Sequence, residues 1–305
     1  MVGKIKLSRL NKFWGYLLKI AVSAVILYFL LSNIDIPQLS AGFSMVGWST
    51  ICLVFFLGVT LWFIEYLRFY ISTKVILKKD TDGWLLRVFF SGYALRFLIP
   101  GGLGEVGKMM FIPGKYSQRL IAYLADKGSL AFVILIGGPA GVWKVFPQIR
   151  QYYWIPLLIV LVAFLIVYHL VLKKSRSFNG NQFYPLKKVL MVTIPLSFIH
   201  VFIMALQYWL ILRSVDIPFS IVFMTVNIVL FAVMIPISFA GLGVREWTTL
   251  QILGQFAISK ETALVTPLLV FVCNVLVPAL IGVAVILIFK MKPALVTWNQ
   301  IDLHQ

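Results

Sequence analysis

The feature that most constrains the fold is a pair of apolar runs that are each interrupted by an Ile-Pro step and by glycines. The first interruption reads Leu98-Ile99-Pro100-Gly101-Gly102-Leu103-Gly104-Glu105, and the second reads Met234-Ile235-Pro236-Ile237-Ser238-Phe239-Ala240-Gly241-Leu242-Gly243-Val244-Arg245-Glu246. Proline removes a backbone donor and clashes with the preceding turn, so a helix cannot continue smoothly through it. Glycine permits a tight reversal of the chain. We therefore predict that each run folds as two short helices joined by a break.

The surroundings of both breaks are apolar enough to place them in a membrane. Hydrophobic residues make up 61% of the 305 residues and charged residues only 12%, and apolar runs of transmembrane length recur along the chain. Irregular backbone is tolerated at that depth only where protein or a water-filled cavity covers it. The alternative is that both hairpins are full tilted spans, eight spans in all. We predict re-entrant hairpins, with arms at Val88–Ile99 and Leu103–Ile112, and at Phe219–Ile235 and Val244–Ala257.

Six further apolar runs are uninterrupted and are predicted to be full spans, so the expected fold class is an all-α polytopic membrane protein. Basic residues cluster at the N-terminus, around Lys78, around Lys173 and after the last span. The positive-inside rule then places both termini in the cytoplasm. The predicted spans are Tyr16–Leu31, Val46–Leu67, Leu120–Val142, Ile155–Leu172, Val189–Leu212 and Ala263–Phe289.

Each half of the chain has the same order of elements, namely span, span, hairpin and span. Residues 1–150 and 151–305 are therefore predicted to be two repeats of a single membrane domain. Because each repeat makes three full crossings, the second begins on the opposite side of the membrane from the first. This is the inverted topology of many secondary transporters. The first hairpin should enter from the cytoplasm and the second from the outside.

The charge distribution indicates a lipid surface as the basic residues' partner. The formal net charge is +17, and the basic residues lie in short loops between apolar runs. Anionic headgroups at the cytoplasmic membrane face suit such loops, whereas nucleic-acid binding would need a continuous basic domain. Cys52 and Cys273 lie in apolar segments, and no residues have the Cys/His spacing of a metal site. We predict no cofactor, no metal and no nucleic-acid partner.

The start of each hairpin's second arm is the predicted substrate site. Free backbone N–H groups and the helix dipole favour an anion there, and a lipid phosphate is the natural one. The basic residues nearby would add full positive charge. The alternative is that they only pair with Glu105, Asp126 and Glu246 and hold the hairpins together. The predicted substrate-binding residues are Arg96, Gly101, Gly102, Gly104, Glu105, Lys108, Gly241, Gly243, Arg245 and Glu246, with Pro100 and Pro236 as structural breaks.

Other polar residues within the apolar runs have more ordinary predicted roles. Glu65 and Arg68 are three residues apart near a span end and are interpreted as an interfacial pair. Polar residues deeper in the spans are expected to form interhelical hydrogen bonds, with the lining of a polar path as the alternative. These residues are His200, Gln207, Asn227 and Asn274.

The second break closely resembles the second signature of the lysylphosphatidylglycerol synthase transmembrane region, also called the flippase-like domain family. Pro100, Gly104-Glu105 and Lys108 look like that family's first signature, in which Arg more often stands at the position of Lys108. The resemblance covers nearly the whole chain. It implies a membrane protein related to the flippase half of bifunctional aminoacyl-phospholipid enzymes. Because the chain ends soon after Lys292, the soluble aminoacyl-transferase domain of those enzymes is not expected, and neither is lysyltransferase activity.

These features predict a lipid flippase or lipid-linked substrate transporter. Its cargo would be an anionic phospholipid or glycolipid crossing the cytoplasmic membrane, and its site would lie between the two hairpins. One alternative is a membrane-embedded transferase that acts on a lipid carrier and uses Glu105 and Glu246 as its acid and base. A second alternative is a non-catalytic partner in lipid or glycolipid assembly.

Overall fold

The computed structural model describes residues 46–78, 82–98, 103–114, 116–148, 183–235 and 241–290, and these ranges contain helices and short connections without a β-strand. The predicted spans Tyr16–Leu31 and Ile155–Leu172 lie outside the described residues. In chain order the helices are α3 (Trp48–Leu77), α4 (Asp82–Leu98), α5 (Leu103–Gly107), η1 (Lys108–Phe111), α6 (Tyr116–Val145), α8 (Phe183–Ile211), η4 (Leu212–Ser214), α9 (Phe219–Val233), α10 (Val244–Leu253), η5 (Gly254–Phe256), α11 (Lys260–Phe271), η6 (Val272–Leu276) and α12 (Val277–Ile288).

Four of the helical segments are long and apolar enough to cross a membrane. Each contains 28 to 30 residues, which at ~1.5 Å per residue exceeds the ~30 Å thickness of the hydrocarbon core. Large apolar side chains such as Phe56, Phe63 and Ile288 are exposed on their outer faces, as expected of surfaces in contact with lipid tails. The chain is an all-α polytopic membrane protein, as predicted. The four segments are Trp48–Leu77, Gln118–Val145, Leu186–Ser214 and Lys260–Ile288.

The two interrupted runs form pairs of short helices. In the first pair α4 contacts α5, and in the second α9 contacts α10. The second arms cover only residues 103–111 and 244–256, including their short 3-10 ends. Even the longer of these is about 20 Å at ~1.5 Å per residue, too short to cross the bilayer. This favours hairpins over the alternative of eight spans. The breaks themselves, with Pro100 and Pro236, lie outside the described residues.

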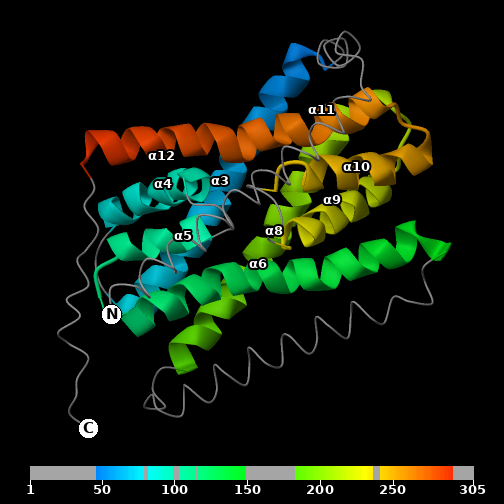
Figure 1. Cartoon of the computed structure of the whole chain (residues 1–305). Helices are drawn as coiled ribbons and strands as arrows, with labels where there is room; N and C mark the ends of the chain where they lie inside the picture. Colours follow the sequence, from blue (N-terminus) through cyan, green and yellow to red (C-terminus); the bar gives the residue numbers. More distant parts are fainter. Residues whose placement is uncertain are drawn as a thin grey trace, which may run out of the picture.

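The hairpins occupy opposite ends of the helical bundle (Figure 1). Figure 1 shows α4 and α5 together at one end of the long helices, and α9 and α10 together at the other. Helix α4 packs along α12, α9 packs along α6, and α3 packs along α8. Helices α4 and α12 approach so closely that a Cβ added at Gly282 of α12 would lie only 2.1 Å from the Phe90 carbonyl oxygen on α4. Small residues at helix contacts are typical of membrane bundles.

The last span is irregular at its centre, where a π-helical turn, η6, separates α11 from α12. Asn274 in this turn donates from Nδ2 to Gln207 Oε1 at 2.7 Å and accepts from Gln207 Nε2 at 3.0 Å. The prediction of interhelical hydrogen bonds is confirmed for these two residues. It is wrong for Asn227, whose Nδ2 donates to the Phe223 carbonyl of its own helix at 2.8 Å.

Candidate functional site

A chain of alternating charges lies buried against the first hairpin. Arg68 Nε of α3 is 3.4 Å from Asp126 Oδ1 of α6, and Lys108 Nζ of η1 is 3.6 Å from the other oxygen of Asp126. Lys108 is also 3.5 Å from Glu105 Oε1, and Glu105 pairs in turn with Lys127 of α6. The side chains of Arg68, Lys108 and Asp126 are almost completely buried. In an apolar surrounding such charges are tolerated only because each has a partner.

The stem of Lys108 fits between α4 and α3. A Cβ added at Gly92 of α4 would lie 2.9 Å from Lys108 Cδ, so glycine leaves the room that this stem fills. The ammonium group lies 4.4 Å from the centre of the Phe69 ring, a favourable cation–π position. The α3, α4 and α6 helices therefore fix Lys108 jointly.

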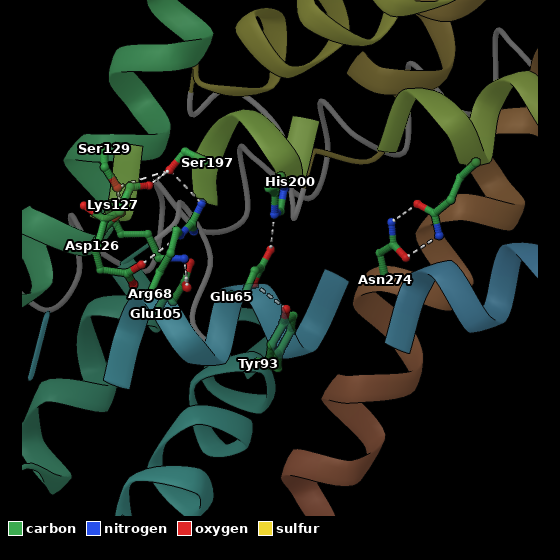
Figure 2. Close-up of polar contacts among 12 residues, drawn as sticks. Glu65, Arg68, Tyr93, Glu105, Asp126, Lys127, Ser129, Ser197, His200 and Asn274 are labelled. Carbon is green, nitrogen blue, oxygen red and sulfur yellow. Dashed lines mark hydrogen bonds and ion pairs between the residues drawn. The ribbon is translucent and has the colours of Figure 1, made fainter. Parts of the chain in front are cut away.

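A second polar group adjoins this ionic chain on the side of α8 (Figure 2). Tyr93 of α4 donates to Glu65 Oε2 at 2.5 Å, and His200 Nδ1 of α8 lies 3.4 Å from Glu65 Oε1. Arg68 Nη1 donates to Ser197 Oγ of α8 at 3.1 Å. The predicted interfacial pairing of Glu65 with Arg68 is therefore wrong, because Glu65 lies beside His200 of α8, whereas Arg68 is fully buried and donates to Ser197 of α8. His200 lies at the contact between α8 and α3, but the described structure does not show the interhelical hydrogen bond predicted for it.

The second hairpin has a different internal arrangement. Gly241 and Gly243 have φ values of 79° and 82°, the positive range that glycine adopts without strain. The N–H of Gly243 donates to Glu246 Oε2 at 2.6 Å, so this carboxylate caps its own helix, α10. The Arg245 guanidinium is buried and lies 4.7 Å from the centre of the Phe271 ring of α11.

The model of the family described as the lysylphosphatidylglycerol synthase TM region matches residues 16–282 of the chain. The chain belongs to this family. The match confirms the resemblance inferred from the two break motifs, and it covers the ionic chain and both hairpins. A search of curated proteins found no match.

The family's two motif regions lie in different surroundings in this member. Glu105 and Lys108 of the first region belong to the buried ionic chain, and Gly104 lies in the first turn of α5. Gly241, Gly243, Arg245 and Glu246 of the second region lie at the start of α10. Gly101 and Gly102 lie outside the described residues. The predicted residues thus form two clusters, one at each hairpin.

Arg96 differs from the other predicted cations. It is half-buried on α4, and within the described part of the chain it has neither an ion pair nor a hydrogen bond. It lies within electrostatic range of Glu105 in the first hairpin and of Arg245 in the second. Among the three predicted cations of the site, Arg96, Lys108 and Arg245, Arg96 is therefore the one without a described partner.

Several residues of the buried site were not predicted to bind substrate. These charges stand inside apolar runs, which is a recognisable signal because intramembrane charges are costly. Their partners, however, come from other helices and cannot be paired from spacing alone. Within the described ranges no group of three or more His, Cys, Asp or Glu side chains could hold a metal ion. The residues of the site outside the predicted substrate-binding set are Arg68, Tyr93, Asp126, Lys127 and Ser197, of which Asp126 was named as a possible ion-pair partner.

Proposed function

We propose that this protein moves an anionic lipid, either a phospholipid or a lipid-linked glycan, across the cytoplasmic membrane. The observation that carries the proposal is the placement of two short-armed hairpins at opposite ends of the bundle, each with buried charge at its second arm. Hairpins that end within the bilayer expose helix ends to a polar cargo. The family match supports lipid handling, and several different lipid cargoes are compatible with it.

The helix contacts support two inverted repeats at 1–150 and 151–305. The first hairpin arm α4 packs on α12, the last span of the second half, and α9 packs on α6, the last span of the first half. Exchanging the two halves therefore exchanges these two contacts, and it leaves the central contact between α3 and α8 in place. Two equivalent halves around one site would allow alternating access from each leaflet.

Arg96 and Arg245 are the proposed contacts for the lipid headgroup. Lys108 is neutralised by Glu105 and Asp126, so its proposed role is to fix the first hairpin. The N-terminus of α10 would add backbone N–H groups beside Arg245. Helix α5 spans only Leu103–Gly107, too short for a comparable dipole, so the equivalent site predicted there is not proposed again.

Lipid movement can be measured with purified protein in vesicles that contain a fluorescent phosphatidylglycerol in both leaflets. A membrane-impermeant quencher removes only the outer-leaflet signal. We expect protein-containing vesicles to lose nearly all fluorescence and empty vesicles about half. If the labelled lipid instead becomes a new covalent product, the protein is a transferase. If neither happens with phosphatidylglycerol or with a polyprenyl-phosphate sugar, the transport proposal is wrong.

The orientation of the hairpins gives a separate prediction. We expect the end of the first hairpin to face the cytoplasm and the end of the second to face outside. Tyr116 and Gln255 are exposed positions at these two ends. With Cys52 and Cys273 replaced by Ala, an impermeant maleimide added to intact cells should label Gln255→Cys, and should label Tyr116→Cys only after lysis. The reverse pattern would invert the topology.

A further inference from the structure

Glu65 differs from Asp126 and Glu105, the carboxylates of the ionic chain, in what surrounds it. Asp126 lies between Arg68 and Lys108, and Glu105 lies between Lys108 and Lys127, so both have permanent cations within ion-pair distance. The described contacts of Glu65 are the Tyr93 hydroxyl at 2.5 Å and His200 Nδ1 at 3.4 Å. Neither partner carries a permanent positive charge. The charge on Glu65 is therefore balanced at close range only when the pair holds a proton.

Because the pair lies among apolar helices, a proton on it would lower the free-energy cost of the Glu65 charge. The side chain of His200 is 6% exposed and that of Glu65 is 15% exposed, and both lie on membrane-spanning helices. An ionised carboxylate is costly in such a place unless it is neutralised. Carboxylate and imidazole groups are the usual members of intramembrane proton relays.

Charged groups from every neighbouring element face the pair. Arg68 and Lys127 lie near both Glu65 and His200, and Asp126 lies near His200. Among the described residues, the groups that act on Glu65 or His200 are Arg68 on α3, Tyr93 on α4, Lys108 on η1, and Asp126 and Lys127 on α6, while Arg96 and Glu105 act on Tyr93.

The pair is mechanically connected to the first hairpin. Glu65 precedes Arg68 by one turn of α3, and Ser197 precedes His200 by one turn of α8. The two helices therefore meet at two adjacent contacts, Glu65 with His200 and Arg68 with Ser197 (Figure 2). Tyr93 attaches the hairpin arm α4 to Glu65 at the first of these contacts. A protonated Glu65 is a weaker acceptor than a carboxylate, so proton uptake loosens the attachment of α4 to α3.

We propose that Glu65 and His200 form a proton-binding site that couples lipid movement to a proton gradient across the membrane. This inference rests on the proposed transport function. A proton from water on one side binds the pair, the Tyr93 contact weakens, and the hairpin arm α4 is released to move. The same proton leaves to the other side once the site has changed its access. No covalent bond is formed or broken apart from those to this proton.

Proton binding can be tested without any lipid transport. Infrared difference spectra of the reconstituted protein between about pH 5 and about pH 8 should contain a carboxyl C=O band and imidazole bands. We expect Glu65→Gln to remove the carboxyl band and His200→Gln to remove or shift both sets. Spectra that are the same in wild type and both variants would overturn the proton site.

Coupling is tested in vesicles that contain labelled phosphatidylglycerol and an internal pH dye. A gradient of one pH unit supplies about 1.4 kcal/mol, equivalent to about a tenfold change in rate. We expect the gradient to change the rate of wild-type lipid movement by up to this factor, and an uncoupler to restore the rate measured without a gradient. The internal pH should change as the lipid moves. Glu65→Gln and His200→Gln should both lose the response to the gradient.

Gln207→Ala is the matched control. Gln207 lies on the same helix as His200, is buried and bonds across the bundle to Asn274, but it is not titratable. This variant should keep the response to the gradient. A wild-type rate that ignores the gradient, or a Glu65→Gln variant that still follows it, would refute coupling. Wild-type protein that binds protons but moves no lipid would refute the transport function and the coupling, while leaving the proton site in place.

Discussion

Both hairpins pack closely against a long helix, but the first is also attached to its neighbours by side-chain charges, whereas the second has a carboxylate that caps its own helix. Lys108 reaches Asp126 of α6, and Tyr93 reaches Glu65 of α3. In the second hairpin the Glu246 carboxylate caps its own helix, and α9 approaches α6 so closely that a Cβ at Gly141 would lie 3.0 Å from the Met224 carbonyl oxygen.

This difference separates a hairpin whose contacts with neighbouring helices include ion pairs from one whose described contacts are a cap within its own helix and close helix packing. Ion pairs depend on the protonation of both partners and on any new charge that enters the site. Glycine-dependent packing depends on neither, and the Glu246 cap acts only within its own helix. We infer that the first hairpin is the responsive element and that the second is the fixed reference against which it moves. The predictions that follow test this division.

Removing the central carboxylate of the ionic chain should have the largest effect. Asp126→Asn leaves Arg68 and Lys108 buried without their shared partner. Breaking a buried ion pair in this way typically costs about 3–5 kcal/mol. We expect a large loss of folded protein and a much lower thermal unfolding midpoint in detergent.

The control for this prediction is Asp216→Asn, at an exposed position after α8. A surface substitution of this kind should change stability by less than about 0.5 kcal/mol. If Asp126→Asn unfolds at the same temperature as wild type and as Asp216→Asn, the ionic chain does not hold the first hairpin, and the contrast between the hairpins is lost.

Arg245 should matter more for lipid movement than for folding. Loss of a charge-assisted contact to a headgroup would cost on the order of 1.5–3 kcal/mol, roughly ten- to a hundredfold in affinity. We expect Arg245→Ala to slow lipid movement by about that factor, with a small change in unfolding temperature. Arg245→Lys should restore only part of the rate, because Lys lacks the planar fork that matches phosphate.

The competing explanation is that Arg245 only neutralises Glu246. Removing Arg245 would then leave a buried carboxylate unpaired and destabilise the fold. The double variant Arg245→Gln with Glu246→Gln separates the two explanations, because it removes both charges together. Recovery of folding and of lipid movement in the double variant would contradict the headgroup role of Arg245.

The sequence allows most of the described architecture to be predicted, because apolar length and helix-breaking residues are local signals. The spans on α3, α6, α8 and α11–α12 and both hairpins follow from them. The end of α3 does not. The predicted end was Leu67, but the helix continues to Leu77 because Arg68 is buried against Asp126 instead of reaching the membrane surface.

The site was less predictable because its partners are distant in sequence. Ser197 is 129 residues from Arg68, and no spacing rule pairs them. Gly92 has no local signal either, since its importance comes from the Lys108 stem that passes beside it. The capping by Glu246 is the exception. It involves residues three apart at a helix start and has the form of half a capping box.

Glu246→Gln should change protein stability less than Asp126→Asn does. The Glu246→Gln side chain keeps an oxygen that can accept from the Gly243 N–H, so the cap survives with a neutral acceptor. Glu246 is 1% exposed, and its Oε1 has no hydrogen-bond partner, so the substitution also removes a buried charge. These effects oppose each other, and we expect a net change below about 1 kcal/mol.

Glu105→Gln is the matched substitution in the first hairpin. It removes the charge that pairs with both Lys108 and Lys127, and no backbone cap compensates for it among the described contacts. Thermal unfolding should therefore place Glu105→Gln well below Glu246→Gln, although the same chemical change is made in the corresponding residue of each motif. If the two variants lose equal stability, Glu246 also acts through ion pairing, and both hairpins must be regarded as responsive to charge.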